Sequence, residues 1–383
     1  MEMHAELDRR AFIRQLAVLA GGAATAACSA GVVTGPRGFP PDTTPPVTPP
    51  TSLDGMFVSA RARGLTFGCG LNYAGLSDAA LLAAHTRESG MVVPIAQGAW
   101  NQTHPGPSTW NFSVMDDLWS WAQSVHLPMR GTHLVWHQAL PAWFSANVTS
   151  ANASQYMRDH IQAFLGRYKG LFHSWNPVNE AVLPSDGRPD GLRNSPWLQL
   201  MGPQYIPQAF NFAAQVDPSA TLVYNEFGIE EDTPLADRKR QFTLQLLQSL
   251  VQQGVPIHAL GMQSHIAANS AIDASKLTAF LDAVAALGLR IFITELDVKD
   301  QTLPANIAAR DAGVAAMYHT YLSAMLAHPA VSVVITWGLS DRLTWLTNQA
   351  PRPDGLPVRV LPLDDQLQRK PAWTAIVNSF TGR

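Results

Sequence analysis

One helix followed by one strand is predicted by residues 273–298, DASKLTAFLDAVAALGLRIFITELDV. Leu277, Leu281 and Val284 recur at the three- and four-residue spacing that places side chains on one face of a helix. Gly288 then stands where helices commonly end with a glycine. The β-rich run after this glycine predicts a strand, so the stretch contains one complete helix and strand unit.

The same alternation repeats from about residue 60 to the end of the chain. The eight predicted strands are Leu65–Leu71, Met91–Ala96, Met129–Trp136, Ser174–Glu180, Ala220–Phe227, Ala259–Ile266, Arg290–Val298 and Val331–Leu339. Between them lie predicted helices, which include Asp78–Glu88 after an N-cap at Ser77, Asp273–Leu287, Ala308–Ala327 and Pro371–Phe380. Strict alternation of strands and helices predicts a parallel sheet, and the nearly continuous apolar run Val331–Ile335 is typical of a strand buried on both faces.

Eight such units favour a closed (β/α)8 barrel of the α/β class, the TIM barrel, in a single domain. A doubly wound open sheet is the alternative, and it normally carries a glycine-rich phosphate turn after its first strand. Here that position has Gly68 and Gly70 without the third glycine of the motif, so the sequence favours the barrel. In a TIM barrel the reactive groups lie at the carboxyl ends of the strands.

The composition is that of a globular protein, with 46% hydrophobic and 14% charged residues among 383. A formal net charge of −3 gives no reason to expect a nucleic-acid partner. The two cysteines, Cys28 and Cys69, are too few for a disulfide scaffold or a cysteine-rich metal site. His133 and His137 lie on a predicted strand, where a spacing of four does not build the helical histidine pair of zinc sites. We therefore expect no metal and no cofactor.

Residues 1–28 resemble an export signal, because Arg9-Arg10 followed by Phe12 is similar to a twin-arginine motif and the apolar run after it is too short to span a bilayer. Small residues before Cys28 resemble a lipoprotein processing site, and simple cleavage near the alanines is the alternative. The Pro- and Thr-rich residues 29–54 predict a semi-rigid tether, which leaves residues 55–383 for the barrel. We expect an exported monomer in the periplasm or cell envelope, or secreted, with membrane attachment only through a lipidated Cys28.

Two glutamates stand at the ends of predicted strands that lie on opposite sides of the barrel mouth. Glu180 ends the run WNPVNE of strand four, and Glu295 lies within FITELD of strand seven. A buried carboxylate is costly unless it is paired or used in catalysis. Carboxyls about 5–5.5 Å apart are the arrangement of retaining glycosidases, in which one carboxylate attacks the anomeric carbon and the other acts as acid and base. We therefore expect Glu180 and Glu295 to form such a pair, one as nucleophile and the other as general acid/base.

Six motifs in order resemble glycoside hydrolase family 10, the retaining endo-β-1,4-xylanases, from about Phe67 to Phe380. They are Leu134-Val135-Trp136-His137, Trp175-Asn176-Pro177-Val178-Asn179-Glu180, Gly261-Met262-Gln263-Ser264-His265, Ile293-Thr294-Glu295-Leu296-Asp297, Trp337-Gly338 with Trp345, and Leu363-Asp364-Asp365 with Lys370-Pro371-Ala372. The resemblance implies a TIM barrel and cleavage of β-1,4-xylosidic bonds in xylan.

The resemblance implies that Glu295 is the nucleophile and Glu180 the general acid/base, and it also implies roles for the residues that bind the substrate. Asn179 would bond the sugar 2-hydroxyl, and Gln263 would bond the sugar in subsite −1. His265 would keep Glu295 ionised and oriented. The side chains that would surround the sugar at the barrel mouth are Trp136, His137, Trp337 and Trp345.

Departures from the family pattern are concentrated on the glycone side of the site. Four positions that usually carry polar groups of subsite −2 hold the apolar residues Ile95, Ala96, Ala99 and Ala139. Strand three reads Gly-Thr-His where the family reads Gly-His-Thr, so strand alternation predicts that Thr132 shares a face with Trp136 and that His133 points the other way. The alternative is a bulge that re-aims His133 toward the site.

The two glutamates of the family are present, but the polar residues of subsite −2 are replaced, and this combination leaves three hypotheses. The first is a retaining endo-1,4-β-xylanase of polysaccharide catabolism. The second is a retaining β-glycosidase for a different β-linked glycan, such as an envelope or exopolysaccharide. The third is a non-catalytic carbohydrate-binding barrel.

Overall fold

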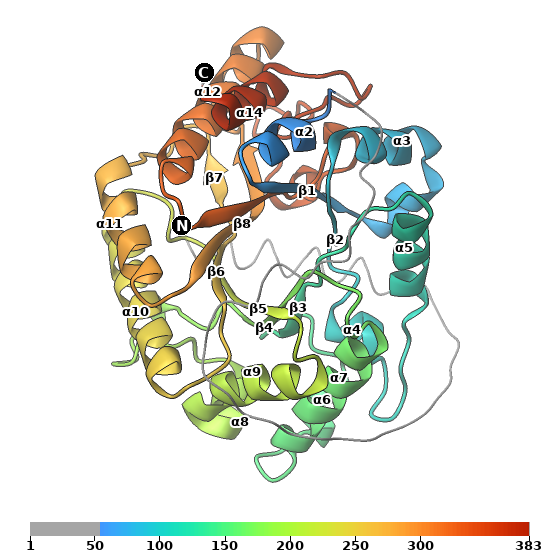
Figure 1. Cartoon of the computed structure of the whole chain (residues 1–383), viewed down its shortest axis with the longest axis vertical. Coiled ribbons are helices and arrows are strands. Elements are labelled where there is room, and N and C mark those ends of the chain that lie inside the picture. Colours follow the sequence, from blue (N-terminus) through green and yellow to red (C-terminus); the bar gives the residue numbers. More distant parts are fainter. Residues whose placement is uncertain (1–53, 383) are drawn as a thin grey trace.

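A computed structural model describes residues 54–382 (Figure 1). The expected export signal, Cys28 and the tether up to residue 53 lie outside the described residues. Within the described part, parallel strands form a ring with helices around the outside (Figure 1), as the (β/α)8 prediction requires.

The strands follow the predicted order, and several are shorter than predicted. They are β1 (Thr66–Leu71), β2 (Val92–Pro94), β3 (His133–Val135), β4 (Ser174–Asn179), β5 (Thr221–Glu226), β6 (Ala259–Met262), β7 (His265–Ala267), β8 (Arg290–Lys299) and β9 (Val331–Thr336). The sheet order is β2-β1-β9-β8-β6-β5-β4-β3, and β7 pairs with β8. Parallel bridges from Met129 to Val92 and to Phe172 join the start of the third strand segment to β2 and close the ring.

The sixth predicted strand, Ala259–Ile266, is interrupted in the structure. It divides into β6 and β7 at Gln263 and Ser264, and Ser264 has a left-handed backbone with φ of 68°. Ser264 is held by a backbone hydrogen bond from its nitrogen to Glu230 Oε1 at 2.9 Å. The break turns the side chain of Gln263 toward Glu180, and it turns the side chain of His265 toward Glu295 and Asp297.

Helices follow the strands along the chain, and the longer ones pack on the outside of the ring (Figure 1). They are α2 (Met56–Ala62), α3 (Ala79–Glu88), α4 (Trp100–Thr103), α5 (Ser113–Ser124), α6 (Phe144–Asn147), α7 (Ala153–Arg167), α8 (Pro196–Met201), α9 (Tyr205–Val216), α10 (Pro234–Gln252), α11 (Ala274–Ala285), α12 (Ile307–Leu326), α13 (Leu346–Gln349) and α14 (Pro371–Thr381). The prediction of Ser77 as N-cap of α3 was wrong. Ser77 ends a preceding 3₁₀ turn and donates to the Ala74 carbonyl, and Asp78 caps the helix by accepting from Leu81 N at 3.0 Å.

Alternation along the strands separates two apolar layers. Val334 points outward and packs in the layer between strands and helices, whereas Val333 and Ile335 point into the barrel with Phe292 and Val223. Trp337 packs against this interior cluster from the carboxyl end of β9. The apolar interior of the barrel therefore lies directly beneath the side chains at the barrel mouth and packs against them through Trp337.

Candidate active site

Glu180 follows directly after β4 and is 2% exposed. Its backbone is left-handed, with φ of 58°, which costs about 1–3 kcal/mol for a residue with a Cβ and which the surrounding contacts must offset. Asn179 Nδ2 and Gln263 Nε2 both donate to Glu180 Oε1, at 3.2 and 2.9 Å. The carboxyl group is thus held by two neutral amides.

Glu295 lies within β8, and its side chain is 13% exposed. The register between β8 and β9 shifts between Ile293 and Leu296, so the strand is irregular where it carries this residue. Asn225 Nδ2 donates to Glu295 Oε1 at 2.8 Å, and His265 Nε2 lies 3.2 Å from Oε2. Both carboxylate oxygens therefore have a protein donor.

A chain of amides connects the two glutamates. Asn225 Nδ2 also donates to Asn179 Oδ1 at 2.8 Å, and Asn179 Nδ2 donates to Glu180. Thr294 Oγ1 donates to Asn225 Oδ1 at 2.7 Å, which fixes the orientation of the Asn225 amide. A movement of one carboxylate would therefore disturb the hydrogen bonds of the other.

His265 bridges two carboxylates, since its Nδ1 lies 3.0 Å from Asp297 Oδ1 while its Nε2 faces Glu295. Burial lowers the pKa of His265, but the charges and hydrogen bonds of Asp297 and Glu295 outweigh burial and hold the pKa above its ordinary value. Only the protonated ring can donate from both nitrogens. In that form the ring donates to Asp297 and to Glu295 at the same time.

Asp297 also positions one of the tryptophans. Trp345 Nε1 donates to Asp297 Oδ2 at 2.7 Å, and the Trp345 ring lies 4.8 Å from the His265 ring between centroids. Asp297 and Asn225 were not predicted as site residues. The sequence signal for both was their place at the carboxyl ends of strands five and seven.

One cavity brings most of the predicted residues together. It is lined by Asn179, Glu180, His265, Glu295, Trp136, Trp337 and Trp345, together with Ile95, Ala96, Ala99, Asn101, Thr132, His133, Gln138 and Ala139. Gln263 lies behind this lining and reaches the cavity through Glu180. His137 is not part of the lining, and its ring packs edge-on against Trp136 with centroids 5.9 Å apart.

The expectation that His133 points away from the site was wrong. His133 and Thr132 both line the cavity, and the His133 ring lies 4.5 Å from the Trp136 ring between centroids. The reason is that regular strand geometry is confined to residues 133–135, so strict alternation does not extend to Thr132 or Trp136. Burial lowers the pKa of His133 to about 4 against the opposing charges of Glu295 and Glu180, so its ring is neutral at pH 7.

The four apolar positions noted in the sequence lie together in this cavity. Ile95, Ala96, Ala99 and Ala139 all contribute to the lining. Ala96 and Ala139 have left-handed backbones, with φ of 65° and 55°, a conformation in which Asn is far more common than Ala. The backbone at Ala96 and Ala139 would thus accommodate Asn well, whereas the alanine side chains offer no hydrogen bond to a sugar.

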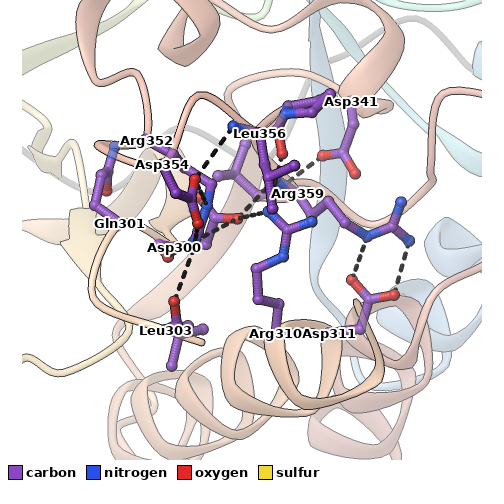
Figure 2. Close-up of polar contacts among 12 residues, drawn as sticks. Asp300, Gln301, Leu303, Arg310, Asp311, Asp341, Arg352, Asp354, Leu356 and Arg359 are labelled. Carbon is purple, nitrogen blue, oxygen red and sulfur yellow. Dashed lines mark hydrogen bonds and ion pairs between the residues drawn. The ribbon is translucent and has the colours of Figure 1, made fainter. Parts of the chain in front are cut away.

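The segment after β9, which carries Trp345, is fastened by buried charges (Figure 2). Arg352 donates to the carbonyls of Asp300 and Leu303, and the backbone nitrogen of Arg359 donates to Asp300 Oδ2 at 3.1 Å. The Arg359 guanidinium makes two parallel bonds to Asp311 of α12, each 2.7 Å. Trp345 therefore stands on a segment that is tied to the end of β8 and to α12.

No group of three or more His, Cys, Asp and Glu side chains in residues 54–382 is arranged to hold a metal ion. Among the same residues, no helix combines the length and the apolar character needed to cross a membrane.

A parallel α/β barrel with two carboxylates and three tryptophans around one cavity at its mouth defines a glycoside hydrolase. Residues 56–379 match the sequence model of glycosyl hydrolase family 10, and the chain belongs to this family.

Named relatives and solved structures agree with this assignment. The chain is 34% identical over 300 residues to endo-1,4-beta-xylanase A of Thermoanaerobacterium saccharolyticum, covering 74% of this chain and 24% of that longer protein. It is 30% identical over 282 residues to endo-1,4-beta-xylanase B of Thermotoga neapolitana, covering 73% and 79% of the two chains. The crystal structure of xylanase 10B from Thermotoga maritima superposes with a TM-score of 0.78 at 28% identity, over 86% and 98% of the two chains.

Proposed function

We propose that this protein is a retaining endo-1,4-β-xylanase, with Glu295 as nucleophile and Glu180 as general acid/base. The observation that carries the proposal is that the two glutamates line one cavity in different environments. Glu295 faces His265, whose pKa is held above its ordinary value, and Glu180 accepts from the amides of Asn179 and Gln263. The relatives named as endo-1,4-beta-xylanases support xylan as the substrate.

In the first step a carboxylate oxygen of Glu295 attacks the anomeric carbon, and the bond from that carbon to the glycosidic oxygen breaks. Glu180 transfers its proton to the departing oxygen, and a covalent glycosyl ester forms on Glu295. Asn225 and His265 hold the two Glu295 oxygens and limit their rotation before attack.

In the second step the ionised Glu180 takes a proton from water, and the water oxygen attacks the anomeric carbon. The ester bond breaks, Glu295 is released as a carboxylate, and Glu180 is protonated again. Because each step inverts the anomeric carbon, the product keeps the β configuration.

The remaining predicted residues bind the sugar in subsite −1 or support the groups that bind it. Asn179 lies between the two glutamates and bonds the 2-hydroxyl, a contact that strengthens in the transition state. The rings of Trp136, Trp337 and Trp345 enclose the sugar. Gln263 acts near the same subsite through its bond to Glu180, and His137 supports Trp136.

The experiment is incubation of the full chain with xylan, mixed-linkage β-glucan, cellulose and a crude envelope polysaccharide, with Glu295→Ala as the blank. Mass spectrometry should find xylo-oligosaccharides from xylan in the wild type and none in the blank. Nuclear magnetic resonance during the reaction should show β-anomers first. If products form only from another glycan, xylan is not the substrate, and the proposed mechanism applies to that glycan instead. Binding without turnover would refute the enzymatic proposal.

We also propose that the chain is exported by the signal in residues 1–28 and acts as a monomer in the periplasm or envelope or outside the cell. Arg9-Arg10 and the small residues before Cys28 support this. Mass spectrometry of the native N-terminus should find a chain that begins at or near Cys28, with an added lipid mass if Cys28 is the anchor. An uncleaved N-terminus would contradict export by this signal.

A further inference from the structure

The backbone that follows the acid/base residue is held at successive peptide groups. The Glu180 nitrogen donates to the Asn225 carbonyl at 2.9 Å, and the Glu180 carbonyl accepts from Arg193 Nε at 2.8 Å. The Ala181 nitrogen donates to Tyr224 Oη at 3.1 Å, and the Val182 nitrogen donates to Glu226 Oε2 at 3.0 Å. Two of these partners are side chains from the end of β5.

The two side chains belong to a buried polar cluster. Tyr224 Oη donates to Glu226 Oε2 at 2.6 Å, and Lys239 Nζ of α10 lies 2.9 Å from Glu226 Oε1. The side chains of Lys239 and Glu226 are 1% and 0% exposed. Burial and the charge of Glu226 raise the pKa of Tyr224 well above its ordinary value, so its hydroxyl keeps the proton that it donates.

Burying an ion pair between a strand and a helix costs desolvation free energy, and apolar residues of similar volume often stabilise such a contact as well or better. This pair does something that apolar residues cannot do, since Glu226 accepts from three backbone or hydroxyl donors in addition to Lys239. The third is the Phe227 nitrogen, at 3.0 Å from Oε1. Lys239 neutralises the carboxylate and also stacks over the Phe227 ring, with Nζ 3.6 Å from the centroid.

We propose that Tyr224, Glu226 and Lys239 are positioning residues that hold residues 180–182 and thereby fix the left-handed backbone from which Glu180 presents its proton. None of the three lines the cavity, so each acts through Glu180 and not on the sugar. This inference rests on the proposed role of Glu180 as acid/base.

A positioning role makes a prediction that a merely structural role does not. Proton donation matters for a substrate whose leaving group is a poor one, and it contributes little when the leaving group departs as a stable anion. Attack by Glu295 is needed in both cases. If the cluster is removed, the decrease in kcat/KM should therefore be larger for the poorer leaving group. A general loss of folded protein should instead reduce kcat/KM equally for both substrates.

The experiment compares kcat/KM for phenyl β-xylobioside and 2,4-dinitrophenyl β-xylobioside in the full chain. This parameter reports the first chemical step, in which Glu180 is the acid. The variants are Tyr224→Phe, which removes one hydroxyl, and Lys239→Met, which removes the neutralising charge. The double variant Glu226→Gln with Lys239→Met removes both charges and covers the case in which Lys239→Met alone does not fold.

The matched control is Lys370→Met. Lys370 is also a buried lysine in an ion pair, 2.5 Å from Asp341, but it lies on the segment before α14 and touches neither residues 180–182 nor β5. Its loss should change stability without any leaving-group dependence.

For Tyr224→Phe and the folded Lys239 variants, we expect kcat/KM on the phenyl substrate to fall about tenfold or more, while the value on the dinitrophenyl substrate stays within about twofold of wild type. Equal losses on both substrates, or no loss on either, would overturn the proposal. Failure of the proposed function is a different result, because the wild type would then hydrolyse neither aryl xylobioside nor xylan.

Discussion

Asn225 Nδ2 lies 2.8 Å from Glu295 Oε1 and donates a hydrogen bond to it, across 70 residues of sequence. The same nitrogen donates to Asn179, whose own amide donates to Glu180. One buried amide thus contacts Glu295 directly and is linked through Asn179 to Glu180. This arrangement explains why a neutral residue at the end of β5 should matter as much as some groups that touch the substrate.

Substitution of Asn225 by Ala should lower kcat/KM on xylo-oligosaccharides by about 10²-fold, because both glutamates lose a positional constraint of the kind whose loss costs that much. Steady-state kinetics measure the effect, and a thermal melt verifies that the variant is folded. Asn378→Ala, on the outer helix α14, is the control and should leave kcat/KM unchanged. An Asn225→Ala enzyme with wild-type kinetics would show that the amide chain has no catalytic importance.

Titration of His265 by nuclear magnetic resonance should give a pKa above its ordinary value in the folded protein. The protonated ring is then favoured by folding, so its contribution to stability is present below the unfolded pKa of about 6.5 and is lost as pH rises through the folded pKa. Asp297→Asn removes one of the two charges that raise this pKa and should lower it. A pKa at or below the ordinary value in the wild type would contradict the imidazolium bridge.

Acid should destabilise the fold through buried neutral histidines. Burial lowers the pKa of His85 to about 3, so between about pH 6.5 and pH 3 the unfolded chain binds a proton that the folded chain does not. The free energy of unfolding should therefore fall by about 1.4 kcal/mol per pH unit in this window from His85 alone.

His85→Leu should flatten that dependence, as measured by denaturant unfolding at several pH values. The exposed Gln123→Leu change serves as the control, because it adds an apolar side chain without removing a titratable group. If wild type and His85→Leu lose stability in parallel, His85 does not contribute to acid sensitivity.

The apolar residues Ile95, Ala96, Ala99 and Ala139 predict that a sugar in subsite −2 is bound weakly. Ala96→Asn combined with Ala99→Lys would return polar groups to two of its four positions, and Asn tolerates the left-handed backbone at 96 better than Ala does. Each hydrogen bond to a sugar hydroxyl is worth about 1 kcal/mol, so kcat/KM on xylotriose should rise by about 30-fold for the pair. Ala146→Lys, exposed on α6, controls for added charge. Unchanged KM and kcat would sink this account of the subsite.

The barrel could be predicted from the sequence because its signals are local. The apolar spacing in residues 273–287 and the β-rich run after Gly288 depend only on neighbours along the chain, and α11 and β8 lie where these patterns place them. The positions of Glu180 and Glu295 at a shared mouth follow from the rule that parallel strands bring their carboxyl ends to one face.

Side-chain direction was predicted less well wherever a strand is irregular. His133 was assigned to the wrong face because β3 is only three residues long, and strand six was predicted to be continuous although it breaks at Ser264. Alternation holds only while the backbone stays extended, and barrel strands often change direction at their carboxyl ends, where the site is built.

The sequence by itself therefore determined the fold, the family resemblance and the identity of two carboxylates. The tertiary structure decided their environments: the amide of Asn225 shared between Asn179 and Glu295, the imidazolium of His265 between Glu295 and Asp297, and the Tyr224, Glu226 and Lys239 cluster behind Glu180. The physical reason is that secondary structure follows from periodicity along the chain, whereas the electrostatics of a buried group follow from which distant strands bring their side chains within a few ångströms of it.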